Sequence, residues 1–263
     1  MPRAMWSGAI SFGLVNVPVK MFTAAKSKDV HFNQLHGADR SRVQMKRFCS
    51  DEQVEIEYSE LVRGYEVGPD EYVVVTDDEL AALAPTVTSG IEIEEFVDLA
   101  EIDPVFFEHS YYLVPEKAGT KAYALLMGAM RDSGRIALGR VVLRQKQYLV
   151  AIRPAGRALA MSTLFFPDEV VSQDELDGLP GDDIKATDRE LAMAQQLIAA
   201  LSTEFEPEKY RDDYREALLA MIDEKAQGVI IEFTPKAAPS AKVTDLMAAL
   251  EASIAAARQA KAS

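Results

Sequence analysis

The spacing of apolar residues changes near residues 178–181, and this change limits what the chain can fold into. Upstream, short alternating or apolar segments such as Ile91-Glu92-Ile93-Glu94 predict β-strands separated by turns. Downstream, apolar residues recur at the spacing of a helix face. Between them, Gly178-Leu179-Pro180-Gly181 has the composition of a turn-rich linker. We therefore expect a mixed, mainly β protein, with a barrel or sandwich over residues 1–185 and helices after it.

Local patterns within residues 1–185 predict individual elements. Residues 9–15, followed by residues 17–22, predict a strand with an irregularity at Pro18, typical of an edge or a bulge. Thr76 and Glu79 have the spacing of a capping box that opens a short helix ending at Leu83. Further expected elements are strands at 54–58, 72–75, 91–94 and 110–114, a helix at 122–130 and a β-hairpin at 135–153.

The predicted hairpin carries a row of cations. On an unbroken strand Arg140, Val142, Arg144 and Lys146 would share one face, because side chains alternate along a strand. Three cations on one face are suited to following a phosphate backbone.

Two helices are predicted after the linker. Thr187 and Glu190 form a second capping box, and apolar residues follow at helical spacing from Leu191 to Leu201. Pro207 suits the first turn of another helix, which Gly228 would close. Its apolar stripe is expected to contain Tyr210, Tyr214, Leu218 and Met221. These stripes need a partner surface, either the β domain or a second subunit.

The last 35 residues combine a flexible segment with a small amphipathic helix. Residues 229–233 are strand-like, and residues 235–240 have the composition of a linker. A narrow apolar stripe then follows, made of Val243, Leu246, Met247, Leu250 and Ile254. Such a tethered helix either docks on a partner or packs back on its own protein. The residue pattern alone leaves both alternatives open.

Charge is segregated along the chain. The net charge is −14, which by itself argues against a nucleic-acid partner. However, residues 1–50 hold eight Lys/Arg and two Asp/Glu, and residues 111–160 hold nine and two. Residues 51–110 hold one Lys/Arg and 18 Asp/Glu. The basic blocks are either separate solvated faces or, if folding joins them, one positive surface flanked by acidic regions that repel DNA.

The sequence gives no positive case for an enzyme, a cofactor or a metal site. It contains neither G-x-x-x-x-G-K-[ST] nor G-x-G-x-x-G. His31, His36 and Cys49 are too few for a closed zinc site, which needs four ligands and usually a C-x₂-C pair. The single cysteine excludes an intramolecular disulfide, and no signal peptide or membrane span is evident. We expect a soluble cytoplasmic protein.

Longer motifs then identify a family resemblance that spans about residues 4–228. The opening Trp6-Ser7-Gly8-Ala9-Ile10-Ser11-Phe12-Gly13-Leu14-Val15-Asn16-Val17-Pro18-Val19-Lys20 resembles the N-terminal signature of bacterial Ku proteins. The likeness continues at residues 29–36, 46–49, 62–66, 72–80, 102–104, 110–115, 190–194 and 210–218. Some members of this family carry a C-x₂-C near Cys49, and Glu52 replaces its second cysteine here, so no zinc is expected.

The resemblance implies a non-catalytic homodimeric ring. In it a β-barrel domain (1–185) carries a DNA-encircling bridge at about 26–68, residues 186–228 form a helical dimerisation arm, and residues 229–263 form a minimal C-terminal segment that docks a ligase. The ring would hold double-stranded DNA ends independently of sequence, at breaks in the nucleoid. It would recruit a multifunctional ATP-dependent DNA ligase for non-homologous end joining. Because the chain stops after Lys261-Ala262-Ser263 without a Lys-rich tail, weaker translocation or bridging is expected.

The resemblance also implies residue roles. DNA contacts are expected from Lys20, Lys26, Lys28, Arg40, Arg42, Lys46, Arg47, Arg131, Arg135, Arg140, Arg144 and Lys146. Ligase contacts are expected from Lys242, Val243, Asp245, Leu246, Met247 and Leu250. Dimer contacts are expected from Leu191, Leu197, Tyr210, Tyr214 and Leu218. The alternative function is an acidic protein-binding scaffold that does not bind DNA.

Overall fold

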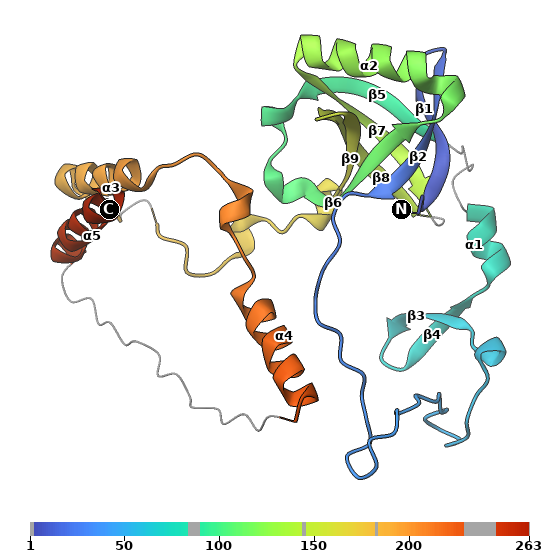
Figure 1. Cartoon of the computed structure of the whole chain (residues 1–263). Coiled ribbons are helices and arrows are strands. Elements are labelled where there is room, and N and C mark those ends of the chain that lie inside the picture. The colour runs from blue at the N-terminus through green and yellow to red at the C-terminus, as the bar shows by residue number, and fades with distance from the viewer. Residues whose placement is uncertain (1–2, 84–89, 144–145, 182–183, 229–245, 263) are drawn as a thin grey trace. The chain divides into compact units, whose positions relative to one another are not determined.

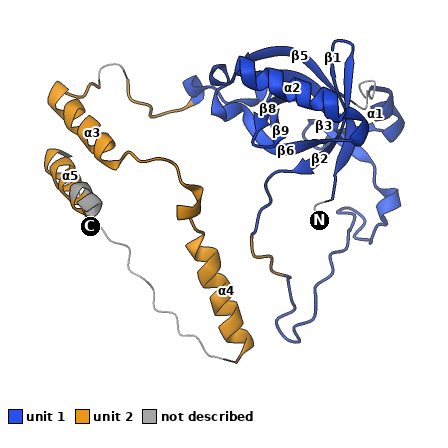
Figure 2. Cartoon of the chain, turned by 45° about the horizontal axis from the view of Figure 1, so that its top comes forward, with its two compact units in different colours: residues 1–28, 33–175 blue, residues 29–32, 176–263 orange. Residues whose placement is uncertain are grey.

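A computed structural model describes residues 3–83, 90–143, 146–181, 184–228 and 246–262. The chain forms two compact units, which Figure 2 draws in blue and orange. The first unit contains residues 1–28 and 33–175, and the second contains residues 29–32 and 176–263.

Seven strands of the first unit close into a barrel (Figure 1). Their order around the barrel is β1-β2-β6-β9-β8-β7-β5. Neighbouring strands are antiparallel except β1 and β5, which run parallel and close the barrel. The strands are β1 (Trp6–Phe12), β2 (Val15–Thr23), β5 (Gly90–Asp98), β6 (Phe107–Pro115), β7 (Arg135–Leu143), β8 (Lys146–Ala155) and β9 (Ala158–Leu164). The predicted mainly β barrel is confirmed.

The barrel interior is an apolar core built by side-chain alternation. In β2, Val17, Val19 and Met21 are buried while the residues between them are half-buried or exposed. Ile10 and Ile152 contribute to the same core from β1 and β8. Period-two burial in a closed sheet fixes the register, because a slip by one residue would expose the whole apolar set.

Helix α2 (Thr120–Ser133) covers one end of the barrel. The Tyr123 hydroxyl donates to the Leu113 carbonyl at 2.7 Å and accepts from the Leu159 amide at 2.6 Å. Leu126 and Met130 are buried beside it. Burial raises the pKa of Tyr123, so the hydroxyl remains a donor. These contacts lie where β6 ends and β9 begins, which defines the end of the barrel that α2 closes.

The N-terminal strand prediction is wrong in one respect. Residues 9–22 form a hairpin of two strands, with a turn at Gly13, whose φ is 57°, and at the fully exposed Leu14. Pro18 lies inside β2, opposite Ala9, and not on a sheet edge. Its carbonyl accepts from the Glu116 amide at 2.9 Å, so β6 still bonds to β2 beside the missing proline donor.

The 135–153 hairpin is confirmed as β7 and β8, but its cations do not share one strand. β7 ends at Leu143, and Lys146 begins β8 directly opposite it. The expected common face on one strand is therefore wrong for Arg140 and Lys146, which lie on β7 and β8. Arg144 itself lies outside the described residues.

The rest of the first unit consists of small elements. β3 (Arg63–Gly68) and β4 (Glu71–Val75) form a separate hairpin, and α1 (Asp77–Leu83) follows it. The Thr76 capping box is confirmed, since the Thr76 hydroxyl accepts from the Glu79 amide and Glu79 accepts from the Thr76 amide. The strand expected at 54–58 is absent among the described residues, where the only pairing is the isolated bridge of Phe48 with Glu55. Short 3-10 turns lie at Tyr58–Glu60, Leu99–Glu101, Pro104–Phe106, Lys117–Gly119, Pro167–Glu169 and Gln173–Glu175.

The second unit contains helices α3 (Asp188–Leu201), α4 (Asp213–Ala226) and α5 (Leu246–Ala262). The Thr187 capping box that begins α3 is confirmed. The helix expected from Pro207 starts later: Pro207–Lys209 is a 3-10 turn, and α4 is capped by Asp212, which accepts from the Arg215 amide at 2.9 Å. Tyr210 therefore lies before the helix, because Asp212 is the stronger start signal. α5 packs against α3.

Candidate nucleic-acid interface

The bridge segment, residues 26–68, has a backbone held mainly by two tight turns. In the first, the His36 and Ser41 backbones are joined by a 2.8 Å hydrogen bond. In the second, the Cys49 amide donates to the Val54 carbonyl at 2.9 Å. The predicted bridge is thus an extended segment with exposed side chains and local hydrogen bonds.

Asp39 organises the first turn. Its carboxylate accepts from the Ser41 amide at 2.9 Å and from the Ser41 hydroxyl at 2.8 Å, and it lies 3.0 Å from His36 Nδ1. The Ser41 amide, followed by the Ser41 hydroxyl, lowers the pKa of Asp39. The carboxylate therefore stays charged and holds the turn that presents Arg40 and Arg42.

Four predicted DNA-binding cations of the bridge segment are exposed and make no ion pair within the described residues: Lys26, Lys28, Arg40 and Arg42. Their charge is available to an external anion. The backbone of Arg40 has a positive φ of 59°, which a turn of this kind requires.

Two further bridge cations already have partners. Lys46 Nζ lies 2.7 Å from Glu55 Oε2. The Arg47 guanidinium lies 5.2 Å from the centre of the Tyr58 ring, a cation–π contact that leaves its charge unneutralised.

The predicted cations of the barrel domain differ from those of the bridge segment, because a carboxylate pairs with most of them. Arg131 donates to the Gly156 carbonyl instead, and Arg144 lies outside the described residues. The ion pairs are Lys20–Glu116 at 3.7 Å, Arg135–Asp98 at 3.0 Å, Arg140–Glu94 at 2.9 Å and Lys146–Glu169 at 3.5 Å. All are exposed pairs, worth about 0–1 kcal/mol each, so an incoming phosphate can displace the carboxylate at small cost.

The pairing of these carboxylates with the cations was not predicted from the sequence. The signal was present in the acid-rich stretch Glu92–Asp98, whose strand β5 pairs with the basic strand β7. Only the pairing of the two strands shows that acidic and basic blocks neutralise each other locally, whereas the bridge segment keeps free cations.

The predicted dimer residues have mixed exposure. Leu191, Tyr210 and Tyr214 are exposed, by 52%, 72% and 77%. Leu197 and Leu218 are half-buried. On α3 the half-buried residues lie on one face, and α5 is packed against this helix. The exposed face, with Leu191, Ile198 and Leu201, has no apolar cover within the chain as described.

The predicted ligase-binding residues are only partly described. Lys242, Val243 and Asp245 lie outside the described residues. Leu246 begins α5, Met247 and Leu250 are half-buried, and Ile254 is buried. The described part of the apolar stripe, Met247, Leu250 and Ile254, lies on the helix that packs against α3 of the same chain, which is one of the two alternatives that the sequence left open.

Other chemistry is limited in the described part of the chain. It contains no group of three or more His, Cys, Asp or Glu placed to hold a metal ion. Within the same residues, no helix is long and apolar enough to cross a membrane.

Comparison with known proteins agrees with the sequence motifs. Residues 11–193 match the family described as the Ku70/Ku80 beta-barrel domain. A protein named non-homologous end joining protein Ku from Anaeromyxobacter sp. (strain K) is 51% identical over 261 residues, covering 98% of this chain and 87% of that protein.

Two more distant relatives with the same name extend the similarity. The protein of Heliobacterium modesticaldum is 44% identical over 252 residues, covering 96% of this chain and 91% of its own length. The protein of Bacillus subtilis is 40% identical over 254 residues, covering 96% and 81%. A barrel in the matched region, the match to the family over residues 11–193 and similarity along almost the whole chain together show that this chain belongs to the Ku family.

Proposed function

We propose that the protein is a homodimeric ring that binds double-stranded DNA ends without reading sequence and brings a ligase to them. Family membership supports DNA end binding in non-homologous end joining. The observation that carries the proposal is the set of unpaired cations on the bridge segment, where Lys26, Lys28, Arg40 and Arg42 are exposed on an extended backbone. Contacts of this kind position a protein on phosphates and carry no base information.

An encircling geometry accounts for DNA binding by a protein with a net charge of −14. Counterion release adds to the binding free energy only where a cation contacts a phosphate, so cations are needed only on the inner wall of the ring. The remaining acidic surface repels DNA from other faces. In this account the ring is loaded from a free end and is retained by topology as well as by charge.

Lys26 and Lys28 provide a direct test against a matched pair on the barrel. The variant Lys26→Glu/Lys28→Glu should lower affinity for linear duplex DNA by about tenfold or more, and should reduce the salt dependence by about one unit per lost phosphate contact. The control Lys117→Glu/Lys121→Glu changes the net charge equally, at exposed lysines that are not among the expected DNA contacts. Fluorescence anisotropy across a salt series measures both variants. Equal losses, or no loss, would contradict the assignment of the bridge segment.

We propose that a second copy of the chain covers exposed apolar residues of this one. Leu191, Ile198, Tyr210 and Tyr214 are all at least half exposed on the second unit. The β3–β4 hairpin adds Tyr65, Tyr72, Val73 and Val74, which are also exposed by more than half. Such an extent of exposed apolar surface is typical of an interaction site.

Light scattering should give a mass about twice that of the 29.0 kDa chain. Leu191→Asp should shift the protein toward the monomer, because it would place a charge in the apolar interface. Gln195→Asp introduces the same charge at an exposed polar position of the same helix and should leave the dimer intact. A wild-type monomer, or identical behaviour of the two variants, would overturn the dimer.

We further propose that the C-terminal segment contacts the ligase. The stripe containing Met247, Leu250 and Ile254 is the apolar face of α5, and it rests on α3 in the isolated chain. Amphipathic helices on tethers dock by this type of face. Ligase binding would then exchange the α3 surface for a surface of the ligase.

Deleting residues 240–263 should leave binding to linear DNA intact and remove stimulation of an end-joining ligase. Leu250→Asp should reproduce the loss, because it puts a charge in the apolar stripe, whereas Glu251→Gln on the exposed side should not. Ligation of linear duplexes with and without the protein measures the effect. Undiminished stimulation by the deletion variant would refute this role.

A further inference from the structure

The two ends of the barrel are built differently. One end is covered by α2, through the buried hydrogen bonds of Tyr123. The opposite end lies where β1 begins at Trp6 and β2 ends next to Met21, since these two residues are paired. This second end, the barrel mouth, opens into a cavity of about 190 Å³. Mouths of β-barrels are common ligand sites, but sites for drug-sized ligands are larger, about 300–1,000 Å³. The mouth therefore suits one small ring system.

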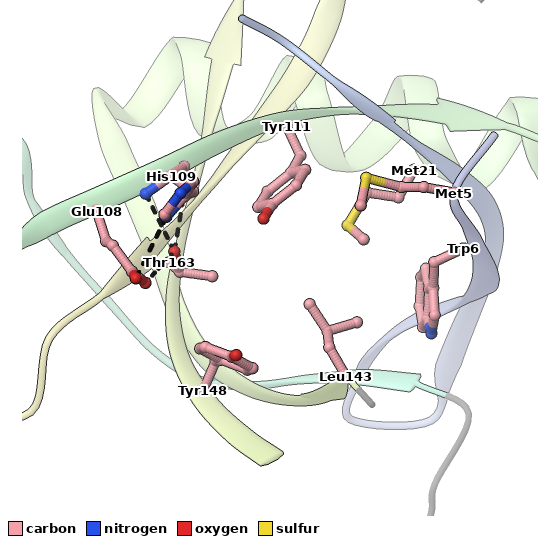
Figure 3. Close-up of a pocket in the computed structure, with 9 residues that line it drawn as sticks. All are labelled: Met5, Trp6, Met21, Glu108, His109, Tyr111, Leu143, Tyr148 and Thr163. Carbon is pink, nitrogen blue, oxygen red and sulfur yellow. Dashed lines mark hydrogen bonds and ion pairs between the residues drawn. The ribbon is translucent and has the colours of Figure 1, made fainter. Parts of the chain in front are cut away.

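The lining of the barrel mouth is rich in flat and polarisable groups. Figure 3 shows the side chains of Trp6, Tyr111 and Tyr148 around one opening that Met5, Met21 and Leu143 also line. Trp6 comes from β1, Tyr111 from β6 and Tyr148 from β8. All three are only partly buried, although they pack against the core. Aromatic walls of this type stack on a planar ring.

One wall of the mouth is polar. The buried Thr163 hydroxyl donates to Glu108 Oε2 at 3.0 Å and accepts from the His109 amide at 3.1 Å. Glu108 Oε1 lies 3.3 Å from His109 Nδ1. Two groups thus hold the Glu108 carboxylate at the edge of the cavity, where it can accept a hydrogen bond from a ligand.

The rim carries an exposed ion pair: Lys146 Nζ lies 3.5 Å from Glu169 Oε1, and an incoming phosphate can displace this carboxylate at small cost. Lys146 Nζ lies 5.2 Å from the centre of the Tyr148 ring, which lines the cavity. A second cation in the mouth would be repelled by Lys146, whereas a phosphate attached to the bound ring would be attracted to it. The aromatic walls, the carboxylate acceptor and the rim cation match three groups of an amino-bearing nucleotide: the planar ring of the base, its exocyclic amino group and the phosphate.

The position of the mouth along the chain favours the same ligand. Thr23, the last residue of β2 before the bridge segment, pairs with Tyr111 of the mouth. The β7–β8 reversal that carries Lys146 is at this end too, since Leu143 lines the cavity. The start of the bridge segment after Thr23 and the Lys146 end of β8 therefore lie at the same end of the barrel as the mouth.

We propose that the barrel mouth binds one unpaired nucleobase from a single-stranded DNA end, with the base among Trp6, Tyr111 and Tyr148. This inference rests on the proposed function, since it adds a site for overhangs to a protein that holds duplex ends. Cytosine and adenine are preferred over thymine, because their amino groups donate to Glu108, whereas thymine offers a carbonyl at that position.

Trp6 reports on the site, because it is the single tryptophan of the chain. Its fluorescence is titrated with the single-stranded tetranucleotides of deoxycytidine, deoxyadenosine and deoxythymidine, which cannot form the duplex needed for threading. We expect saturable quenching, with weaker binding of the thymidine oligomer. Tyr148→Leu should weaken binding about tenfold by removing one stacking surface. Glu108→Gln should remove the preference among bases, because an amide can donate as well as accept.

Retention of blunt linear duplex is measured for the same variants, with thermal unfolding as a check on folding. Unchanged duplex retention together with lost tetranucleotide binding supports a separate base site. Absent quenching, or quenching that Tyr148→Leu leaves unaltered, overturns it. Quenching by N-acetylarginine amide and not by any tetranucleotide also overturns it, in favour of a cationic side chain of a protein partner. If the wild type does not retain blunt linear duplex, the proposed function is overturned, whereas the base site is not.

Discussion

Closure of the barrel by the parallel pairing of β1 with β5 is the constraint on which the rest of the first unit depends. Ile10 pairs with Ile91 across this seam, and both are fully buried. Since β1 also pairs with β2, the strands that precede and follow residues 24–89 both flank β1. The long intervening segment must therefore leave the barrel and return to neighbouring strands. A loop anchored in this way at both ends can carry charge away from the barrel without a core of its own.

The distribution of ion pairs explains how an acidic chain can present a cationic surface. Strand β5 supplies carboxylates beside the arginines of β7, so Arg135 and Arg140 are neutralised locally. The bridge segment has few acids near its first cations, and Lys26, Lys28, Arg40 and Arg42 keep their charge. Exposed ion pairs are weak, so an incoming phosphate can displace the carboxylates of Asp98 and Glu94 at small cost.

Local patterns predicted the strands of a barrel or sandwich, both capping boxes and the β7–β8 hairpin, because these depend on period-two alternation, Ser/Thr-x-x-Glu and turn residues. The family resemblance favoured the barrel over the sandwich. Local patterns could not predict what depends on pairing between distant segments. The Gly13 turn was overlooked because its immediate neighbours Phe12, Leu14 and Val15 are apolar, so the sequence shows no polar turn residues beside the glycine. The ion pair of Arg140 with Glu94 joins residues 46 positions apart. The barrel mouth is built from six strands, and no single segment of the sequence contains its aromatic wall.

We propose that DNA is held by encirclement and not only by a basic surface. Gel-shift comparison of a linear duplex with a covalently closed circle of the same sequence, at moderate salt, tests it most directly. Encirclement predicts that the protein is retained on the linear molecule whatever its sequence. It predicts no retention on the circle, because a closed ring needs a free end to load. Equal binding to both would contradict encirclement and leave only ordinary affinity for the phosphate backbone.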